Sequence, residues 1–368
     1  MDARIQKLAS VLVNYSLALK PGERVLIRAM SPDAEPLAQA LYEEAFNVGG
    51  LPFVYIMMSQ ENEIALESGA SLEQLETMNP LLALAYETFE AVIRIDCPQN
   101  TRALSQYPPD RQRARAKYLS QIIAIQMRRE ANKTLRRCST QFPSFGLAQN
   151  AGMSLRQYED FVFHACKADQ ENPVALWEEV HRSHERLIDW LKGKKHLQVK
   201  GEHIDLEMSI DGRTFLNAGG RSNMPDGEIF TGPVEDSVNG WVRFTYPAYY
   251  QGNEVKGVEL RFENGLVVDA KAQTNEEFLI STLDTDPGSR RLGEFAIGTN
   301  RDIQEFTGSI LFDEKIGGTV HMAVGQGYGE SGSVNQSLVH WDMICDMRDG
   351  GEIIVDGELF YKDGEFVI

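Results

Sequence analysis

The glycine content and the net charge of the sequence both change near residue 195, and this change limits the folds that the chain can adopt. Of the 31 glycines, 24 lie after residue 195, and this second part carries −17 of the chain's formal charge of −18. A length of 368 residues corresponds to two domains at roughly 150 residues each. We therefore expect an N-terminal domain over residues 1–195 and a differently built C-terminal domain over residues 196–368.

In the first half, patterns typical of helices and of strands alternate. Residues 5–19 repeat apolar side chains at helical spacing, and residues 25–27 indicate a short buried strand. The next helix is expected to end at Gly49 and Gly50, because glycine adopts the left-handed backbone of a helix end at little cost. A further strand is expected over residues 51–58. This alternation predicts a parallel α/β sheet.

The second half consists of short runs in which polar and apolar residues alternate. Gly, Asn-Gly and Asp-Gly separate these runs, as in residues 255–272 and 351–368, and such turns are typical of β-hairpins. One helix is expected over residues 277–286. The predicted fold class is therefore an α/β N-terminal domain followed by an α+β, β-rich C-terminal domain.

Composition excludes several classes of protein. No apolar run reaches about 18 residues, so no membrane span is expected. The charged, amphipathic start lacks the features of a signal peptide, and the four widely spaced cysteines fit reduced thiols, so a cytoplasmic protein is expected. The negative charge argues against nucleic-acid binding, which requires a basic surface.

Acidic and imidazole side chains lie between turn residues and short strands of the second half. His340 and Asp342 are two residues apart, so on a strand they face the same side and can bind one metal ion. An ordinary hydrogen-bonded pair is equally compatible with this spacing. Taken alone, His321 fits a core histidine better than a ligand, and Glu228 and Glu294 fit capping or ion-pairing residues better.

Two further residues of this half have alternative roles. Glu314 either joins the other acidic residues or pairs with Lys315 beside it. Tyr328 follows His321 by seven residues in a glycine-rich turn, where it either hydrogen-bonds a developing oxyanion or packs as an ordinary tyrosine. Considered together, two histidines, an aspartate and several glutamates in one half match a hydrolytic site with two metal ions.

The motifs of several other enzyme classes are absent from the sequence. There is no HExxH motif of a zinc peptidase helix, no GxSxG motif, no Walker loop, and no GxGxxG motif after the first strand. None of the cysteines lies in a metal-binding or nucleophile cluster. A site of carboxylates and imidazoles is therefore the favoured source of chemistry.

An ordered set of five segments in the second half resembles the metallo-aminopeptidases of the aminopeptidase T and aminopeptidase S type, the thermophilic metalloprotease family. The segments are NMPDGEIFTGP (223–233), RRLGEFAIGTN (290–300), FDEKIGGTVHMAVG (312–325), GY (327–328) and SLVHWDM (337–343). The first half also resembles this family, for example at PGERVLIRA.

The resemblance implies a set of site residues and a two-domain subunit whose C-terminal domain holds the metal. Tyr328, Glu228 and Glu294 are the implied catalytic residues. In some members fewer residues separate the counterpart of Glu314 from the histidine. The resemblance also implies two divalent metal ions per subunit (zinc, cobalt, manganese or magnesium) and a homodimer. The implied metal ligands are Glu228, Glu294, Glu314, His321, His340 and Asp342.

The predicted function is that of a metal-dependent aminopeptidase. It releases an N-terminal residue, apolar and leucine-like, from short peptides by means of a water molecule activated by two metal ions, with Glu228 or Glu294 passing the proton to the leaving amine. A metal-dependent amidase or dipeptidase is one alternative. A non-catalytic protein that binds peptides or metal on the same fold is the other.

Overall fold

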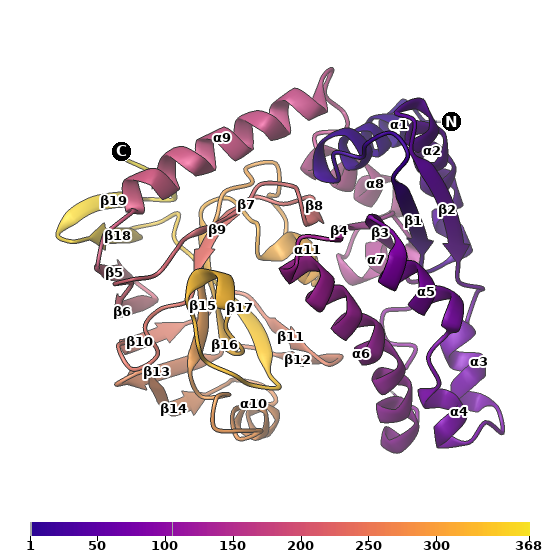
Figure 1. Cartoon of the computed structure of the whole chain (residues 1–368). Helices are drawn as coiled ribbons and strands as arrows, with labels where there is room; N and C mark the ends of the chain where they lie inside the picture. The colour runs from indigo at the N-terminus through magenta and orange to yellow at the C-terminus, as the bar shows by residue number, and fades with distance from the viewer. Residues whose placement is uncertain (1, 105) are drawn as a thin grey trace. The chain divides into compact units, whose positions relative to one another are not determined.

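The computed structural model describes residues 2–104 and 106–368, which form two compact units. The first unit comprises Met1–Trp177 and Gly220–Pro225, and the second comprises Glu178–Gly219 and Asp226–Ile368. Helix α9 (Pro173–Leu191) begins in the first unit and continues in the second (Figure 1). None of the helices in the described ranges is long and apolar enough to cross a membrane.

A parallel sheet forms the centre of the first unit. Its strand order is β2-β1-β3-β4-β8, and every neighbouring pair is parallel. Successive parallel strands need long crossover connections, which the helices of this unit supply. The strands are β1 (Arg24–Ala29), β2 (Leu51–Ile56), β3 (Ala91–Asp96), β4 (Arg136–Gln141) and β8 (Asn223–Met224).

Several helices of the first unit begin at residues suited to capping. Ser71 and Ser154 each accept a hydrogen bond from the backbone N–H three residues later, and Gln74 and Gln157 complete the two capping boxes. The helices are α1 (Ala3–Ser10), which continues into the π-helix Val11–Ser16, α2 (Glu35–Asn47), α3 (Glu61–Glu67), α4 (Leu72–Glu76), α5 (Pro80–Thr88), α6 (Pro109–Ala131), α7 (Phe145–Asn150) and α8 (Leu155–Ala165), with the 3-10 turn Pro32–Ala34 before α2.

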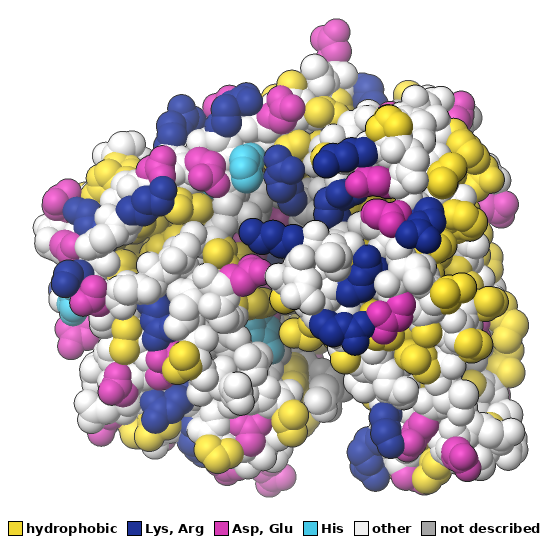
Figure 2. All heavy atoms as spheres, in the orientation of Figure 1, with side chains coloured by type: hydrophobic (Ala, Val, Ile, Leu, Met, Phe, Trp, Pro, Cys, Tyr) yellow, Lys and Arg dark blue, Asp and Glu magenta, His cyan; other side chains and the backbone are white. Residues whose placement is uncertain are grey.

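Inner strands of the parallel sheet pack against helices of the same unit. Leu26 and Val92 of the sheet pack in one core cluster with Tyr86 of α5 and Ile122 of α6. The edge strand β2, in contrast, has several exposed apolar residues, and Figure 2 shows hydrophobic side chains gathered along this side of the first unit. The exposed residues of β2 are Leu51, Phe53 and Val54.

The second unit contains an eight-stranded and a five-stranded antiparallel sheet. The eight-stranded order is β14-β13-β10-β6-β5-β18-β19-β20, and the five-stranded order is β17-β16-β15-β9-β7. In the larger sheet the strands are β5 (His196–Gly201), β6 (Ile204–Ser209), β10 (Asn239–Arg243), β13 (Glu259–Glu263), β14 (Leu266–Lys271), β18 (Glu352–Val355), β19 (Glu358–Lys362) and β20 (Glu365–Phe366).

The smaller sheet lies at the core of the second unit. Its strands β15 (Leu292–Gly298) and β16 (Thr319–Gly325) are buried along their whole length. The other three are β7 (Leu216–Ala218), β9 (Glu228–Thr231) and β17 (His340–Asp346). The remaining elements are the hairpin β11 (Ala248–Tyr250) and β12 (Asn253–Val255), α10 (Glu276–Leu283), α11 (Ile310–Asp313) and the 3-10 turn Gly329–Ser331.

The predicted hairpins are present where the turn dipeptides lie. Asn264 and Gly265 both have positive φ and join β13 to β14, and Asp356 and Gly357 join β18 to β19 in the same way. Both residues of such a turn need this backbone conformation, which Asn, Asp and Gly adopt most readily. The mixed α/β fold predicted from the sequence is confirmed, with both parallel and antiparallel sheets.

Candidate metal centre

Four neighbouring strands of the five-stranded sheet carry five of the six predicted ligands. Glu228 is the first residue of β9, Glu294 the third of β15 and His321 the third of β16. His340 and Asp342 are the first and third residues of β17. Antiparallel pairing of these strands brings residues together that are more than 100 positions apart in the sequence.

Each of these side chains has an alanine or glycine opposite it on a neighbouring strand. Residues in direct register project from the same face of a sheet, so the five ligands share one face and the small residues leave space between them. The register pairs are Glu228 with Gly298, Glu294 with Ala323, His321 with Ala296, His340 with Gly325, and Asp342 with Ala323.

Glu294 lies between the two imidazoles. Its Oε1 is 3.8 Å from Nε2 of His321, and its Oε2 is 3.4 Å from Nε2 of His340. The ligand atoms of Glu228, Glu294 and His321 lie within 4.8 Å of one another, as do those of Glu294, His340 and Asp342. The two groups share Glu294.

Glu314 reaches the same cluster from outside the sheet. It follows α11 as the C-cap residue, and its carboxylate forms a third group of this size with His321 and Asp342. All six predicted ligands are therefore brought together in the second unit. The structure also places Lys315 among them, where sequence reasoning considered it only as an ion-pair partner of Glu314.

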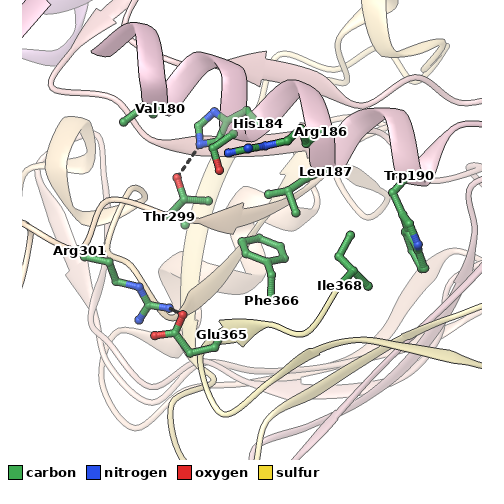
Figure 3. A pocket seen from close by; sticks show the side chains of 12 residues that line it. Val180, His184, Arg186, Leu187, Trp190, Thr299, Arg301, Glu365, Phe366 and Ile368 are labelled. Carbon is green, nitrogen blue, oxygen red and sulfur yellow. Dashed lines mark hydrogen bonds and ion pairs between the residues drawn. The ribbon is translucent and has the colours of Figure 1, made fainter. Parts of the chain in front are cut away.

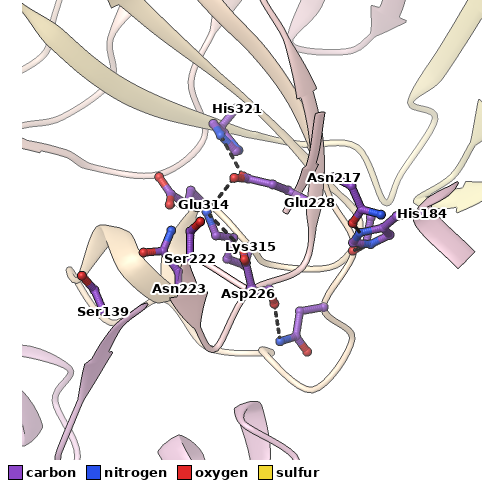
Figure 4. Close-up of polar contacts among 12 residues, drawn as sticks. Ser139, His184, Asn217, Ser222, Asn223, Asp226, Glu228, Glu314, Lys315 and His321 are labelled. Atoms are coloured by element: carbon purple, nitrogen blue, oxygen red, sulfur yellow. Dashed lines mark hydrogen bonds and ion pairs between the residues drawn. The ribbon is translucent and has the colours of Figure 1, made fainter. Parts of the chain in front are cut away.

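Lys315 and Asp226 complete the polar network around Glu228 (Figure 4). Nζ of Lys315 donates to Oε1 of Glu228 at 2.8 Å, forms a short hydrogen bond to Glu314, and lies 3.8 Å from Oδ1 of Asp226. The only signal for Lys315 in the sequence is its place after Asp313 and Glu314, because burial of a lysine cannot be read from sequence.

Tyr328 lies at the edge of the cluster. Its ring packs edge-on against the rings of His340 and Phe230, with centroids 5.3 Å apart in both pairs. The side chain is about half exposed, unlike the ligands. Part of its side chain is therefore accessible from solvent at the edge of the cluster.

Burial and charge change the pKa values of three carboxylates among the predicted ligands. Burial raises the pKa of Glu228 to about 8 and that of Asp342 to about 6. Burial acts in the same direction on Glu294, but hydrogen bonds from His321 and His340 outweigh it and lower the pKa of Glu294 to about 2. The carboxylate between the imidazoles is thus the one that is most firmly ionised.

The pKa values of the two imidazoles are raised by the carboxylates around them. Burial alone would lower their pKa values, but the neighbouring carboxylates prevail. The charge of Glu228 is the main cause that raises the pKa of His321 to about 9, and the charge of Asp342 does most to raise that of His340 to about 10. Without a bound cation, protons on the imidazoles therefore compensate part of the negative charge.

The donor set fits divalent metal ions. Within the described ranges, the buried atoms Oε2 of Glu228 and Oδ1 of Asp342 have no hydrogen-bond partner. Nδ1 of His340 donates to the carbonyl of Gln326 at 2.8 Å, which leaves Nε2 of the neutral ring free to ligate. Carboxylate and neutral imidazole ligands suit several divalent transition metals.

A pocket of about 640 Å³ lies elsewhere in the second unit and contains none of the six ligands (Figure 3). His184 stands in its wall, buried, with Nδ1 3.0 Å from Oδ1 of Asn217 and Nε2 2.8 Å from Oγ1 of Thr299. The other residues that line the pocket include Arg186, Leu187, Trp190, Arg301 and Phe366.

Comparison with known proteins identifies the family of the chain. Residues 1–366 match the family model described as thermophilic metalloprotease (M29). The chain belongs to this family. The resemblance proposed from the five ordered segments is thereby confirmed, and so is the predicted class of enzyme, a metal-dependent peptidase.

Relatives in this family match the chain along almost its whole length. Aminopeptidase T of Thermus thermophilus is 30% identical, with 99% of this chain and 97% of the relative covered. Aminopeptidase 2 of Geobacillus stearothermophilus is 29% identical, with 99% and 95% covered. The solved structure of wild-type AmpT from Thermus thermophilus superposes with a TM-score of 0.87 at 26% identity, covering 99% of both chains.

Proposed function

We propose that this M29 enzyme is an aminopeptidase that removes an N-terminal residue, apolar and leucine-like, from short peptides. The observation that carries the proposal is the convergence of six carboxylate and imidazole side chains, some with buried acceptor atoms that lack hydrogen bonds, in a chain whose relatives are named aminopeptidases. A surplus of carboxylates also attracts the cationic N-terminus of a peptide.

We further propose that the centre holds two divalent ions, drawn from zinc, cobalt, manganese and magnesium. Glu294 belongs to two of the three ligand groups, which supports a bridging role for its carboxylate. His340 and Asp342 would then hold one ion, and Glu228 and His321 the other, with Glu314 adding to either. When bound, such ions polarise a carbonyl and lower the pKa of water.

The chain's own residues provide the remaining chemistry of peptide hydrolysis. Glu228 or Glu294 passes a proton from the attacking water to the leaving amine, since both carboxylates lie at the centre of the cluster. Tyr328 donates a hydrogen bond to the oxygen that becomes negative in the transition state. Although the side chain is about half exposed, its desolvation beside the cluster and the negative charges of Glu294 and Asp342 raise the pKa of Tyr328 well above its usual value, so the hydroxyl keeps the proton that this role requires.

Other features support a proposal for the cellular location, the oligomeric state and the domain organisation of the enzyme. We propose a cytoplasmic homodimer whose subunit has an N-terminal α/β domain and a C-terminal metal-binding domain divided near residue 195. All four cysteines are buried free thiols, which suits a reducing compartment. Exposed apolar residues on the edge strand β2 are one surface that a partner subunit can cover.

The test is hydrolysis of leucine p-nitroanilide by the purified protein, before chelation, after chelation, and after addition of each of the four ions. Activity that is lost on chelation and restored by one ion supports the proposal. An N-acetylated leucine substrate separates the alternatives, because an aminopeptidase requires the free amine and a general amidase does not. Absence of turnover with every ion and substrate would favour a binding protein.

A further inference from the structure

Lys315 is a buried cation inside a site built for cations. Its side chain is only 1% exposed, and its ammonium is surrounded by the carboxylates of Glu228, Glu314 and Asp226 (Figure 4). Two of the three N–H donors of the ammonium are hydrogen-bonded, to Glu228 and to Glu314, and Oδ1 of Asp226 lies 3.8 Å from the nitrogen. Because the side chain is buried, Lys315 does not contact a substrate directly, and any influence on catalysis has to pass through its neighbours.

The contact with Glu228 distinguishes the two oxygens of that carboxylate. Oε1 accepts the hydrogen bond from Lys315 at 2.8 Å, whereas Oε2 lies 3.2 Å from Nε2 of His321, on the side of the ligand cluster. Within the described ranges, Oε2 is the oxygen of Glu228 that lacks a hydrogen-bond partner. Lys315 thus leaves one oxygen of Glu228 for a metal ion and occupies the other.

The backbone of Lys315 is held by the segment that carries Glu228. The carbonyl of Lys315 accepts from the backbone N–H of Asn300 at 3.0 Å, and the Asn300 side chain donates to the carbonyl of Asp226 at 2.9 Å. Asp226 lies two residues before Glu228. The ammonium and the carboxylate it contacts are therefore fixed relative to each other through Asn300.

The ammonium of Lys315 also contributes to the charge balance of the site. Asp226, Glu228 and Asp342 carry three carboxylates, and Glu294 and Glu314 bring the number to five. The single ammonium of Lys315 leaves a formal charge of −4 when the imidazoles are neutral, which two divalent cations balance. Without the lysine, two such ions would leave one buried negative charge uncompensated, and this is costly.

We propose that Lys315 is a positioning residue that holds Glu228 as a one-oxygen metal ligand, which assigns proton transfer to Glu294, and that it completes the charge balance of a two-ion centre. This inference rests on the proposed function of the site. Loss of the ammonium frees Glu228 to bind an ion through both oxygens, which changes the coordination geometry. Loss of a positive charge near the ions also strengthens their attraction to the site.

The test compares K315M with K271M. Lys271 forms an exposed ion pair with Asp269 in the same unit, so it controls for loss of a lysine charge. For K315M we expect a changed visible absorption spectrum of the cobalt-loaded protein, a cobalt Kd equal to or below that of the wild type, and a kcat lowered about 10–100-fold. The KM for leucine p-nitroanilide is expected to change less than about threefold, as for a positioning residue.

The results for K315M, K315Q and the wild type distinguish a failure of the positioning role from a failure of the proposed function. A K315M protein with the cobalt spectrum and kcat of the wild type overturns the positioning role. Weaker cobalt binding together with lower kcat also overturns it, because general damage to the site lowers both. If K315M does not fold, K315Q decides, since its amide retains a donor near Glu228, and failure of both to fold assigns Lys315 a structural role only. An inactive wild type refutes the proposed function, while the cobalt spectra still test Lys315.

Discussion

Nε2 of His340 lies 3.5 Å from Oδ2 of Asp342, two residues further along β17. The alternation of side chains along a strand brings both onto the same face. The hydrogen bond from Nδ1 of His340 to the Gln326 carbonyl fixes the ring so that Nε2 faces Asp342 and Glu294. These contacts place His340 and Asp342 of β17 at the edge of the predicted metal centre.

Replacing His340 by alanine is expected to remove one ligand from the group formed with Glu294 and Asp342. We expect the metal content of the purified protein to fall and kcat/KM for leucine p-nitroanilide to decrease by at least about 100-fold. Elemental analysis and kinetics measure both quantities. H196A is the control, because His196 is half exposed on β5. Full metal content and activity in H340A would remove His340 from the ligand set.

Tyr328→Phe isolates the role of the hydroxyl, because phenylalanine retains the ring that packs on His340. We expect kcat to fall about 100–1,000-fold, as when one oxyanion donor is lost, with KM and metal content nearly unchanged. Steady-state kinetics on the metal-loaded protein measure the effect. Tyr250→Phe, whose ring stacks on Trp341, is the control and should remain active. An unchanged kcat in Tyr328→Phe would leave the tyrosine a packing role.

Metal affinity is expected to rise with pH. In the metal-free protein the pKa of His321 is raised to about 9 and that of His340 to about 10, so both imidazoles carry protons at pH 7. A metal ion has to displace these protons. Competition with a chelator of known affinity should therefore show at least about a tenfold gain in affinity per pH unit between pH 6 and 8. An affinity independent of pH would contradict the raised pKa values.

His184 is expected to make the protein less stable in acid. Burial lowers its pKa to about 4, whereas an unfolded chain has the ordinary value of about 6.5. Between these values only the unfolded state binds the proton, so the contribution is fully present above pH 6.5 and is lost as pH falls towards 4. The loss is at most about 3 kcal/mol in the free energy of unfolding.

Urea unfolding at pH 7 and at pH 5 measures this contribution. H184Q should show a smaller difference between the two pH values than the wild type. H164Q is the matched control, because His164 is exposed and paired with Asp169. Equal pH dependence in wild type and H184Q would show that another group causes the loss.

The cysteine thiols are expected to be unreactive in the folded protein. All four are buried, and burial raises the pKa of Cys97 and of Cys345 to about 12. DTNB should therefore label none of them in native buffer and all four after unfolding in guanidinium chloride. Rapid labelling of a native thiol would show that the region around it opens readily.

The sequence predicts those parts of the site that depend on local patterns. The spacing of His340 and Asp342 predicts a shared face because strands alternate, and Asn264-Gly265 predicts a hairpin because of its backbone preferences. The order of five segments identifies the family. Whether the six ligands bind metal is still a prediction, although their side chains lie together.

Other features depend on tertiary structure and could not be predicted. Lys315 belongs to the network only because α11 and β9 are close in space, and a lysine in a sequence is ordinarily assigned to the surface. No local pattern in the sequence predicts that His184 is buried and hydrogen-bonded, since its partners Asn217 and Thr299 are 33 and 115 residues away. Strand β8 has only two residues, and it pairs with β4 more than 80 positions earlier.

This two-residue strand has a consequence for any attempt to divide the protein. Gly220–Pro225 belongs to the first unit, while the residues on both sides of it belong to the second. No single cut in the chain therefore yields two complete units, because one product always lacks a strand or carries a foreign segment with the buried Met224. The two units therefore have to be expressed and studied together in one chain.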